Sequence, residues 1–489
     1  MLLSKLLSGV EFEFKGDKNN LEIDNLAFDT RKMQSNSLYF CLTGEQSDGH
    51  NFAQTAVKNG AKALVVEHFV DVDVPQIKVK DARAVMAKIS ENFYDNPAKK
   101  LKLIGITGTN GKTTTTYILH SILQHCGFNT GVVGTIGVVV GNKTYPTTMT
   151  TPDPIEFNKI LALMVKNNIT HVVMEVSAHA IALRKMAGIT FDVGVLTNIT
   201  QDHLDYFKTF SHYADTKLSF ISPKYCRCGV VNLDDKLAYT LYSKYKNSAF
   251  ICRGFGISNL KDIHPTSFEL QSDGIIFSAS LNNVLQNYHS KLIGKFNLSN
   301  LLGALAVAEV LGLSPQGVLA GINAIKPVPG RFNVCPLFNG ANAVVDYAHT
   351  PDGLQKILTS AREVCKGRLI CVFGCGGNRD RQKRPIMANI SAKNADYTII
   401  TSDNPRFEEP EKIICEVEEG IKHTGAKYEC VTDREQAIVR AVELSKPNDI
   451  VVIAGKGAEN YLDIKGQKLH YSDYEVLDKI NKNNSEVRL

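Results

Sequence analysis

Short apolar runs recur along the middle of the chain and alternate with stretches that have helical spacing. LKLIGIT at 101–107, THVVMEVS at 170–177, FDVGVLTNI at 191–199 and CGVVNLDD at 228–235 have the composition of strands. Residues 154–167 have the spacing of a helix and lie between two of these strands. Such alternation predicts a mostly parallel sheet covered by helices. An α/β fold class is therefore expected.

The last third of the chain shows the same alternation with strands that are apolar throughout. AVVDY, RLICVFG, DYTIIT and DIVVIAG are continuous apolar runs, as expected for strands with both sheet faces covered. A Pro- and Gly-rich break, KPVPGRF at 326–332, precedes them, and DNPAKK at 95–100 forms an earlier break. The two breaks predict three domains, at 1–98, 99–330 and 331–489.

Composition excludes several classes of protein. The 489 residues are 44% hydrophobic and 21% charged, which is globular, and a net charge of +5 spread along the chain gives no support for a nucleic-acid partner. No stretch approaches 18 uninterrupted apolar residues, so no membrane segment is expected, and the apolar run at the start is too short for a signal peptide. The eleven cysteines lack paired zinc-type spacing. We expect a soluble, cytoplasmic protein with free thiols.

The sharpest local signal is GITGTNGKTTT, which joins the strand at 101–107 to a helix. Gly108 and Gly111 let backbone N–H groups converge on phosphate oxygens, Lys112 supplies a cation, and Thr113 offers a hydroxyl to Mg²⁺. Ile106 stands where the general P-loop pattern has Gly, so a Gly-rich turn without a nucleotide is the alternative. The helix that follows has its apolar positions on one face: Ile118, Leu119, Ile122, Leu123 and Cys126. The order of strand, loop, Lys-Thr and helix favours a nucleotide-triphosphate site.

GTNGKTTT resembles the ATP loop of the Mur ligase family, which also includes folylpolyglutamate synthetase. Further segments match in the same order: TTPDP at 150–154, MEVSAHA at 174–180, TNITQDHLDYF at 197–207, VDYAHTPDGL at 345–354, FGCGGNRDRQKRP at 373–385, SDNPRFEEP at 402–410 and AGKGAENY at 454–461. Within the family they resemble the members that add the third residue to UDP-N-acetylmuramoyl-dipeptide. The resemblance implies a three-domain architecture, with a central P-loop ATPase-like parallel sheet and a C-terminal Rossmann-like domain, in a monomer.

The family's chemistry implies ATP as co-substrate and two Mg²⁺ ions. ATP phosphorylates a substrate carboxylate, and an amine attacks the resulting acyl phosphate; charge neutralisation is central to such phosphoryl transfer. Thr113 and Glu175 are candidate oxygen ligands for magnesium, and by resemblance His203 helps to hold a second ion. Lys217 matches the family lysine that CO₂ carbamylates, which by resemblance turns it into an anionic oxygen ligand for magnesium. The expected catalytic set comprises Lys112, Glu175, His203 and Lys217. The alternative for Glu175 is a salt-bridged residue at a strand end, and the alternative for Lys217 is a solvated lysine on a helix.

The resemblance also assigns residues to each substrate. The ATP site would comprise Gly108, Thr109, Asn110, Gly111, Lys112, Thr113, Thr114, Asn198, Asn300, Arg331 and Asp346, the last two reaching it when the third domain closes. The UDP-substrate site would comprise Thr30, Glu45, Gln46, Ser47, Thr150, Thr151, Ser177 and Lys185. The site for the incoming amino acid would comprise Arg379, Asp403, Asn404, Pro405, Arg406, Gly455 and Glu459.

The last set of residues bears on which amino acid is added. Its motifs each follow a predicted parallel strand, and the carboxyl ends of such strands share one crevice. Two arginines and two acidic residues suit a zwitterion with two charged ends, such as meso-diaminopimelate. Arg406 could pair with the second carboxylate, which L-lysine lacks. A solvated Arg406 on a Pro-stiffened turn, and a solvated basic face at 379–384, are the alternatives.

Three other functions remain open at this point. They are the same reaction with L-lysine, folylpolyglutamate synthesis, and a nucleotide-triggered binding protein that has lost catalysis. Four positions also depart from the pattern of diaminopimelate-adding members: Leu183 and Lys185 replace Gln and Arg, and Phe207 and Ala458 replace His. None of them removes a proposed metal ligand or Arg406. The expected reaction is therefore addition of meso-diaminopimelate to the D-glutamate of UDP-N-acetylmuramoyl-L-alanyl-D-glutamate.

Overall fold

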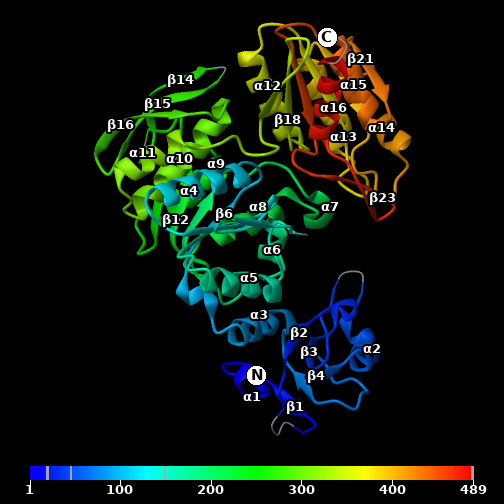
Figure 1. Ribbon diagram of the computed structural model, residues 1–489. Helices are drawn as coiled ribbons and strands as arrows, with labels where there is room; N and C mark the ends of the chain where they lie inside the picture. The colour runs from blue at the N-terminus through cyan, green and yellow to red at the C-terminus, as the bar shows by residue number, and fades with distance from the viewer. Residues whose placement is uncertain (18–20, 45–46, 148, 261, 272, 486–489) are drawn as a thin grey trace. The chain divides into compact units, whose positions relative to one another are not determined.

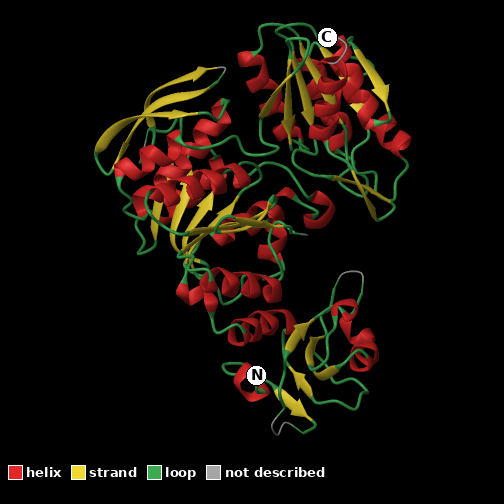
Figure 2. Cartoon of the chain, in the orientation of Figure 1, coloured by secondary structure: helices red, strands yellow, loops and turns green. Residues whose placement is uncertain are grey.

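The structure is a computed structural model that describes residues 1–17, 21–44, 47–147, 149–260, 262–271 and 273–485. Helices and strands alternate through the chain, so the predicted α/β class is confirmed (Figure 1, Figure 2). Its contacts divide the chain into two compact units. The first comprises Met1–Thr107, Gly127–Val195 and Ser219–Gly229, and the second comprises Gly108–Cys126, Leu196–Leu218 and Val230–Leu489.

The N-terminal part of the first unit is a five-stranded sheet with helices on both faces (Figure 1). Its strands, in the order β1-β5-β4-β3-β2, are β1 (Glu13–Lys15), β5 (Gln76–Lys78), β4 (Ala61–Val66), β3 (Ser37–Phe40) and β2 (Asn25–Ala27). Only the edge pair β1–β5 is antiparallel among these strands. The helices are α1 (Leu3–Leu6), α2 (Ala53–Lys58) and α3 (Ala82–Phe93), with short 3₁₀ turns at Thr30–Lys32, Gly49–Phe52 and Pro97–Lys100. Helices α1 and α3 pack on one face of the sheet, and α2 packs on the other.

The central sheet has eight strands in the order β13-β12-β11-β6-β10-β7-β8-β9. They are β13 (Ile251–Phe255), β12 (Cys226–Asn232), β11 (Phe191–Leu196), β6 (Lys102–Thr107), β10 (His171–Glu175), β7 (Thr130–Gly134), β8 (Gly137–Val140) and β9 (Lys143–Tyr145). The four strands predicted from apolar runs are β6, β10, β11 and β12. Strands β6, β10 and β7 are parallel, whereas β7, β8 and β9 form an antiparallel edge that the sequence did not predict.

Eight helices accompany this part of the chain within the described residues. They are α4 (Lys112–His125), α5 (Pro154–Lys166), α6 (Ala178–Ala182), α7 (Leu204–Phe207), α8 (Phe210–Phe220), α9 (Lys236–Tyr245), α10 (Lys295–Val310) and α11 (Pro315–Asn323). Helix α5 confirms the helix predicted at 154–167. Helix α4 buries the predicted apolar face and packs against α10 and α11, while Cys126 follows its last turn. A small antiparallel sheet, β14 (Pro265–Gln271), β15 (Gly274–Leu281) and β16 (Val284–Ser290), lies before α10 in the sequence.

The C-terminal part of the second unit is a six-stranded sheet between two helical layers (Figure 1). The strands, in the order β17-β18-β22-β19-β20-β21, are β17 (Asn333–Pro336), β18 (Asn342–Asp346), β22 (Ile450–Ala454), β19 (Leu369–Phe373), β20 (Tyr397–Thr401) and β21 (Tyr428–Val431). One face carries α12 (Pro351–Val364), α13 (Lys383–Asn394) and α14 (Pro410–Glu418), and the other carries α15 (Arg434–Leu444) and α16 (Asp473–Ser485). A hairpin, β23 (Tyr461–Ile464) and β24 (Gln467–His470), follows β22.

Strands β18, β22, β19 and β20 are neighbours and run parallel, so their carboxyl ends meet at one edge. All four motifs predicted to bind the amino acid or to reach the nucleotide begin at that edge, as the sequence predicted. Among the described residues, no helix is both long enough and apolar enough to span a bilayer.

Candidate active site

The phosphate loop follows β6 and ends at the first turn of α4. Gly108 and Gly111 have φ of +147° and +87°, in the region that favours glycine. A side chain at Gly108 would collide with the Thr197 hydroxyl, and one at Gly111 would collide with the Asn300 amide. The Lys112 ammonium donates to the carbonyl oxygens of Gly108 and Thr109, each at 2.9 Å. Glycine at these two positions therefore allows the loop to pass close to Thr197 and Asn300, and the Lys112 ammonium lies inside the loop.

Asn198 and Thr197, at the end of β11, brace this loop from outside. The Asn198 side-chain amide binds both backbone groups of Asn110, accepting from its N–H and donating to its carbonyl, each at 3.0 Å. The Thr197 hydroxyl donates to the same carbonyl at 2.6 Å. The structure thus places Asn198 against the loop backbone, where it shapes the loop.

Lys217 is buried beneath the loop instead of lying in solvent, so the alternative of a solvated helix lysine is wrong. Its ammonium donates to the Gly108 carbonyl at 2.8 Å and lies 5.0 Å from the centre of the Tyr213 ring. Burial, helped by the charge of Lys112, lowers the pKa of Lys217 well below its ordinary value, against an opposing effect of Asp202. A neutral, nucleophilic amine is therefore favoured at this position.

His203 lies beside Asp202 at the start of α7. Its Nε2 is 3.3 Å from an Asp202 carboxylate oxygen, and its φ of +54° is unusual for a residue with a side chain. Burial acts to raise the pKa of Asp202, but the charges of His203 and His349 outweigh it and lower that pKa. His349 comes from the motif after β18. This cluster joins two segments of the second unit that are far apart in sequence.

Arg331 and Asp346 were expected to reach the nucleotide from the C-terminal domain, and they have different contacts. Arg331 donates to the Thr113 hydroxyl at 2.9 Å and stacks 4.5 Å from the centre of the Tyr347 ring. Asp346 is buried, and its two oxygens accept the backbone N–H groups of Phe332 and Ala348, each at 2.7 Å. Burial raises the pKa of Asp346 despite these bonds. Arg331 touches the loop directly, whereas Asp346 shapes the turn that carries Arg331.

Asp352 was missed by the sequence reasoning. It lies in the first turn of α12, where its carboxylate accepts from the Asn110 side-chain amide at 2.6 Å and from Lys356 at 2.8 Å. The sequence TPDG at this point predicts only a helix start, with Thr350 as N-cap and Pro351 at the first position. No signal in the sequence shows that the same turn contacts the phosphate loop.

In the first unit, Glu175 ends β10 and pairs in register with Ile106 of β6, the strand from which the phosphate loop leaves. Its carboxylate accepts from the Thr135 N–H at 2.8 Å and from the Thr135 hydroxyl at 3.2 Å. Glu175 is buried, and Gly134 leaves room for it because a side chain there would collide with the carboxylate. Its carboxylate is therefore held by hydrogen bonds at the strand's carboxyl end.

The predicted muramoyl-peptide contacts surround Glu175. The Thr150 hydroxyl lies 3.0 Å from that of Thr135, and the Thr151 hydroxyl donates to the Glu175 carbonyl at 2.9 Å. Ser177 caps α6 by accepting the Ala180 N–H at 3.2 Å. Lys185 is buried and forms an ion pair with Asp153 at 2.9 Å. The structure therefore brings Thr150, Thr151 and Ser177 together around Glu175.

The predicted UDP contacts in the N-terminal sheet are less defined. Thr30 begins the first 3₁₀ turn, and its carbonyl accepts the Asn59 side-chain amide at 3.0 Å. Ser47 is exposed, and its carbonyl accepts the Gly44 N–H at 3.0 Å. Glu45 and Gln46 lie outside the described residues.

At the carboxyl edge of the six-stranded sheet, Asn404 joins several predicted residues. Its side-chain amide donates to Glu459 at 3.0 Å, and its oxygen accepts from the Lys456 ammonium at 3.0 Å. Burial acts to raise the pKa of Asp403, but Lys456 and Arg434 outweigh it and lower that pKa. Gly455 has φ of +119°, and a side chain there would meet the Asp403 carboxylate at 2.6 Å. Asp403, Asn404, Gly455 and Glu459 therefore form one cluster.

Arg406 and Arg379 differ in how firmly they are held. Arg406 has φ of +54°, is 22% exposed at its side chain, and donates to the Gly377 carbonyl at 2.9 Å. Gly377 in turn lies against the Pro405 carbonyl. Arg379 is exposed and contacts only the carbonyl of its neighbour Asn378, at 3.4 Å, among the described residues. The alternative of a solvated Arg406 is wrong.

Three buried cations behind this cluster were also missed. Arg434 makes two hydrogen bonds of 2.8 Å to Asp473, and Lys456 is fully buried. Arg384, in the basic run at 379–384, is buried and pairs with Glu408, whose pKa it lowers to about 2. The interpretation of the whole run as a solvated face is therefore wrong. A single basic residue in the sequence gives no signal that its side chain is buried.

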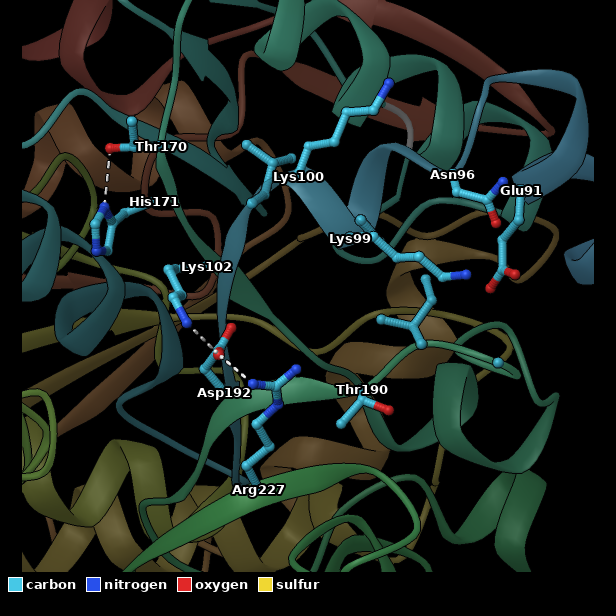
Figure 3. Close-up of a pocket in the computed structure, with 14 residues that line it drawn as sticks. Glu91, Asn96, Lys99, Lys100, Lys102, Thr170, His171, Thr190, Asp192 and Arg227 are labelled. Atoms are coloured by element: carbon cyan, nitrogen blue, oxygen red, sulfur yellow. Dashed lines mark hydrogen bonds and ion pairs between the residues drawn. The ribbon is translucent and has the colours of Figure 1, made fainter.

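A separate cavity of about 570 Å³ lies in the first unit, at the amino ends of β6 and β10 (Figure 3). Lys102 and Arg227 both face Asp192 there, at 3.2 and 3.7 Å. Lys100 pairs with Asp95. None of the predicted site residues lines this cavity, and most of its cations are already paired with carboxylates. The chemistry predicted from the motifs therefore lies elsewhere.

Comparisons with known proteins agree along the whole chain. Residues 22–94 match a model described as the Mur ligase family catalytic domain, residues 106–308 the Mur ligase middle domain, and residues 330–457 the Mur ligase glutamate ligase domain. A protein of Clostridium acetobutylicum named UDP-N-acetylmuramoyl-L-alanyl-D-glutamate--2,6-diaminopimelate ligase 1 is 40% identical over 487 residues, which cover 99% of each chain.

Solved structures give the same result. A UDP-N-acetylmuramoyl-L-alanyl-D-glutamate--2,6-diaminopimelate ligase superposes with a TM-score of 0.67 at 30% identity, covering 97% of each chain. A MurF ligase from Thermotoga maritima in complex with ADP superposes with a TM-score of 0.66 at 21% identity, covering 95% of this chain and 98% of that one. At that identity the second likeness shows the fold alone.

Proposed function

The chain belongs to the Mur ligase family, and from this premise we propose that it is the ATP-dependent ligase that joins meso-2,6-diaminopimelate to the D-glutamate of UDP-N-acetylmuramoyl-L-alanyl-D-glutamate. The reaction would supply a peptidoglycan precursor in the cytoplasm, and the protein would act as a monomer. The observation that carries the proposal is the braced phosphate loop with a buried amine, Lys217, 2.8 Å from its Gly108 carbonyl.

The proposed domains are 1–98 for the UDP end of the substrate, 99–330 for ATP, and 331–489 for the amino acid. Polar loops of the first domain, with Thr30, Glu45, Gln46 and Ser47, would contact the nucleotide diphosphate. Thr150, Thr151 and Ser177 would contact the muramoyl-dipeptide, with Lys185 near its charged groups. These hydroxyls surround Glu175 in the structure, which supports a peptide carboxylate arriving near this strand end.

The phosphate loop would bind the triphosphate through its backbone N–H groups and Lys112. Lys112 now donates to two loop carbonyls, and it would turn to the β- and γ-phosphates when ATP is bound. Asn198 would keep the loop in the binding conformation, because it holds both backbone groups of Asn110. Asn300 and Arg331 would border the nucleotide, and Asp346 would fix the turn that carries Arg331.

We propose that the chain binds two Mg²⁺ ions. Thr113 would offer a hydroxyl, Glu175 a carboxylate and Lys217 its carbamate, which are the oxygen ligands that Mg²⁺ prefers, and His203 would offer an imidazole nitrogen. When bound, the ions would neutralise charge on the triphosphate. A Mg²⁺ ion on the Thr113 hydroxyl would repel the Arg331 guanidinium that now donates to it, so Arg331 is proposed to move as the nucleotide binds.

Lys217 would serve as a carbamate. Its neutral amine attacks the carbon of CO₂, a C–N bond forms, and the nitrogen loses one proton to give an anionic carbamate. The lowered pKa of Lys217 favours the neutral amine that this step requires. The negative charge of the carbamate would then lie near the Lys112 ammonium and attract it.

In the ligation itself, an oxygen of the D-glutamate side-chain carboxylate attacks the γ-phosphorus, and ADP leaves with the bridging oxygen. The amine of diaminopimelate then attacks the acyl carbon, loses a proton, and displaces inorganic phosphate. Backbone N–H groups and cations stabilise charge at each stage, which is the main contribution of protein to such transfers. The chain's residues would thus position three substrates and neutralise their charges.

The crevice of the C-terminal sheet would hold the incoming amino acid. Asp403 and Glu459 supply negative charge, while Arg406 and Arg379 supply positive charge. Asn404 and Pro405 fix the turn between them. Such a site complements a molecule with ammonium and carboxylate groups at both ends, which supports diaminopimelate over L-lysine.

The test is ADP release by the purified chain with Mg²⁺, ATP and UDP-N-acetylmuramoyl-L-Ala-D-Glu, offering meso-diaminopimelate or L-lysine in parallel. We expect turnover with diaminopimelate that needs all three substrates. Preference for L-lysine would retain the ligase and reject the proposed selectivity. No ADP release with either amine, in a folded protein that binds ATP, would reject the proposed function. Lys112→Ala is the matched control, because it removes the loop cation without altering the amino-acid crevice.

A further inference from the structure

The cavity of about 570 Å³ in the first unit lies at the amino ends of four neighbouring strands of the central sheet (Figure 3). Strands β12, β11, β6 and β10 each begin beside it, and the turn before β6 and the loop before β11 complete its wall. The phosphate loop leaves the opposite end of β6. All lining residues belong to the first unit. Because ligand pockets span roughly 300–1,000 Å³, this one has room for a small molecule.

One carboxylate on the wall, that of Asp192, faces two cations. Its Oδ2 accepts the Leu103 N–H at 2.9 Å, so this oxygen is committed to the sheet. Its Oδ1 lies 3.2 Å from the Lys102 ammonium and 3.7 Å from the Arg227 guanidinium, and both side chains point toward it (Figure 3). The second distance is too long for a hydrogen bond. Arg227 makes no hydrogen bond among the described residues, so its N–H donors are available to a ligand.

Lys99 adds a third cation from the turn before β6. Within the described part of the chain, its ammonium has neither a hydrogen bond nor an ion pair, whereas Lys100 beside it pairs with Asp95. The second carboxylate that lines the cavity, Glu91, pairs with Lys88 at 3.3 Å. These two ion pairs are each neutral as a whole. They leave the charge of Lys99 without compensation.

The charges that line the cavity therefore do not balance. Lys99, Lys102 and Arg227 carry three positive charges, and Asp192 sets one negative charge against them, which leaves an excess of two. Burial lowers the pKa of His171, which also lines the cavity, against an opposing effect of Asp192, so its ring adds no charge at neutral pH. A phosphate monoester carries a charge of about −1.5 to −2 near pH 7. It matches this excess better than a single carboxylate does.

We propose that this cavity binds the phosphoryl dianion of a small molecule through Lys99, Lys102 and Arg227. The Arg227 guanidinium would donate in a fork to two phosphate oxygens, and the two ammonium groups would neutralise the remaining charge. Asn96 and Thr190 also line the cavity, and their side chains make no hydrogen bond among the described residues, so they are available to hydroxyl groups of the ligand. A sugar phosphate combines both features. The site goes beyond the proposed function, because no residue assigned to its three substrates lines it.

Isothermal titration calorimetry of the full chain with glucose 6-phosphate tests the site. We expect a Kd of roughly 1 mM or tighter, as for two or more hydrogen bonds between charged groups. Glucose 6-sulfate has a similar shape but a single negative charge, and it should bind about 3-fold or more weakly. Equal affinity for the two esters would reject the preference for a dianion.

Inorganic phosphate, as a third probe, separates two sources of the phosphoryl group. Affinity equal to that of glucose 6-phosphate would assign the site to free phosphate, whereas weaker binding would assign it to a phosphate ester whose hydroxyl groups contact the wall. Either result supports the proposal. No binding of either phosphate probe at about 10 mM would overturn it.

Variants locate the bound glucose 6-phosphate. The Arg227 side chain is 67% exposed, so Arg227→Ala should leave the fold intact and lower the affinity by roughly 10-fold or more. Lys99→Ala should lower it by about 3-fold or more. Arg362→Ala, at an exposed arginine paired with Asp396, is the matched control and should change it by less than about 3-fold. Lys112→Ala, in the phosphate loop, should also change it by less than about 3-fold. Unchanged affinity in Arg227→Ala and Lys99→Ala would place the probe elsewhere and contradict the proposal.

Discussion

Lys217 illustrates how its surroundings change what a side chain can do. Its amine is buried under the phosphate loop, and burial together with Lys112 lowers its pKa well below the usual value. A lysine in solvent would be an ammonium and would not react with CO₂. At this position the neutral amine is favoured, so the same residue type becomes a nucleophile.

Lys217→Ala should lower ligase activity by on the order of 100-fold or more, because it removes a group that stabilises charge in the transfer. Added acetate should restore part of the activity by supplying a carboxylate in the space left by the carbamate. The assay is ADP release with and without acetate. Lys224→Ala, an exposed lysine, is the control and should keep full activity. A fully active Lys217→Ala protein would reject this role.

Carbamylation also predicts a dependence on pH and CO₂. As pH falls through the lowered pKa of Lys217, the amine gains a proton and no longer attacks CO₂; the carbamate also loses CO₂ in acid. Incubation in CO₂-free buffer at low pH should therefore remove activity, and return to pH 8 with bicarbonate should restore it. Recovery of full activity at pH 8 without bicarbonate would contradict this.

Residue-level chemistry in the crevice was only partly predictable. The motifs identified Asp403, Asn404 and Arg406, because these residues follow one strand in sequence. Asp463 and Arg434 lie on other elements, and only the folded chain brings them to the same place. Asp346 and Asn198 were predicted to line the nucleotide site, and in the structure their side chains bind backbone groups. A motif shows which residue is present, not which atom it touches.

At the scale of elements, α4 depends on glycines at both of its ends. Gly111 precedes its first residue with φ of +87°, and Gly127 follows it with φ of +86°. A side chain at Gly111 would collide with Asn300, whereas one at Gly127 would meet nothing within 4 Å. At both positions the backbone conformation would strain any residue with a side chain, and the two positions differ only in the atoms that surround them.

Gly127→Ala should therefore destabilise the protein by about 1 kcal/mol and leave ATP binding unchanged, since only backbone strain is added. Gly111→Ala should add loss of ATP affinity of about 10-fold or more, because the loop must shift away from Asn300. Calorimetric titration with ATP and urea unfolding followed by far-UV circular dichroism measure the two effects; the chain has no Trp for fluorescence. Equal ATP affinity in both variants would contradict the account of the loop.

Helix α12 tests the packing of the C-terminal sheet. Leu354, Ile357, Leu358 and Ala361 are buried at helical spacing against that sheet. Leu358→Ala should lower the free energy of unfolding by about 2–5 kcal/mol, as for other buried leucines. Leu260→Ala, at a side chain 69% exposed, should change it by less than about 0.5 kcal/mol. Urea unfolding compares the two; equal effects would place Leu358 outside the core.

Elements were predicted well where the sequence pattern was strong. Strands β6, β10, β18 and β22 are continuous apolar runs, and each lies where the pattern placed it. The antiparallel edge β8–β9 and the hairpin β23–β24 were not predicted, because they are short, partly polar and stabilised by pairing with neighbours. The hairpin contacts the loop that carries Arg406, because the Asp463 carbonyl accepts the Arg406 N–H at 2.9 Å.

At the scale of the whole molecule, the order of motifs carries the functional argument. The phosphate loop follows one parallel strand of the central sheet, and the amino-acid motifs follow parallel strands of the C-terminal sheet. Ligand sites at the carboxyl ends of such strands are the rule for open α/β sheets. The three matched family models cover these segments in the same order. The proposal of a three-substrate ligase follows from that arrangement.

The most direct measurement uses UDP-N-acetylmuramoyl-L-Ala-D-Glu labelled with ¹⁸O in the D-glutamate side-chain carboxylate, incubated with ATP, Mg²⁺ and meso-diaminopimelate. Mass spectrometry of the product and of the released phosphate follows both halves of the reaction. We predict a product that has gained one diaminopimelate with loss of one oxygen label, and phosphate that carries this label, as transfer through an acyl phosphate requires. ADP release with unlabelled phosphate and an unchanged dipeptide would contradict the account.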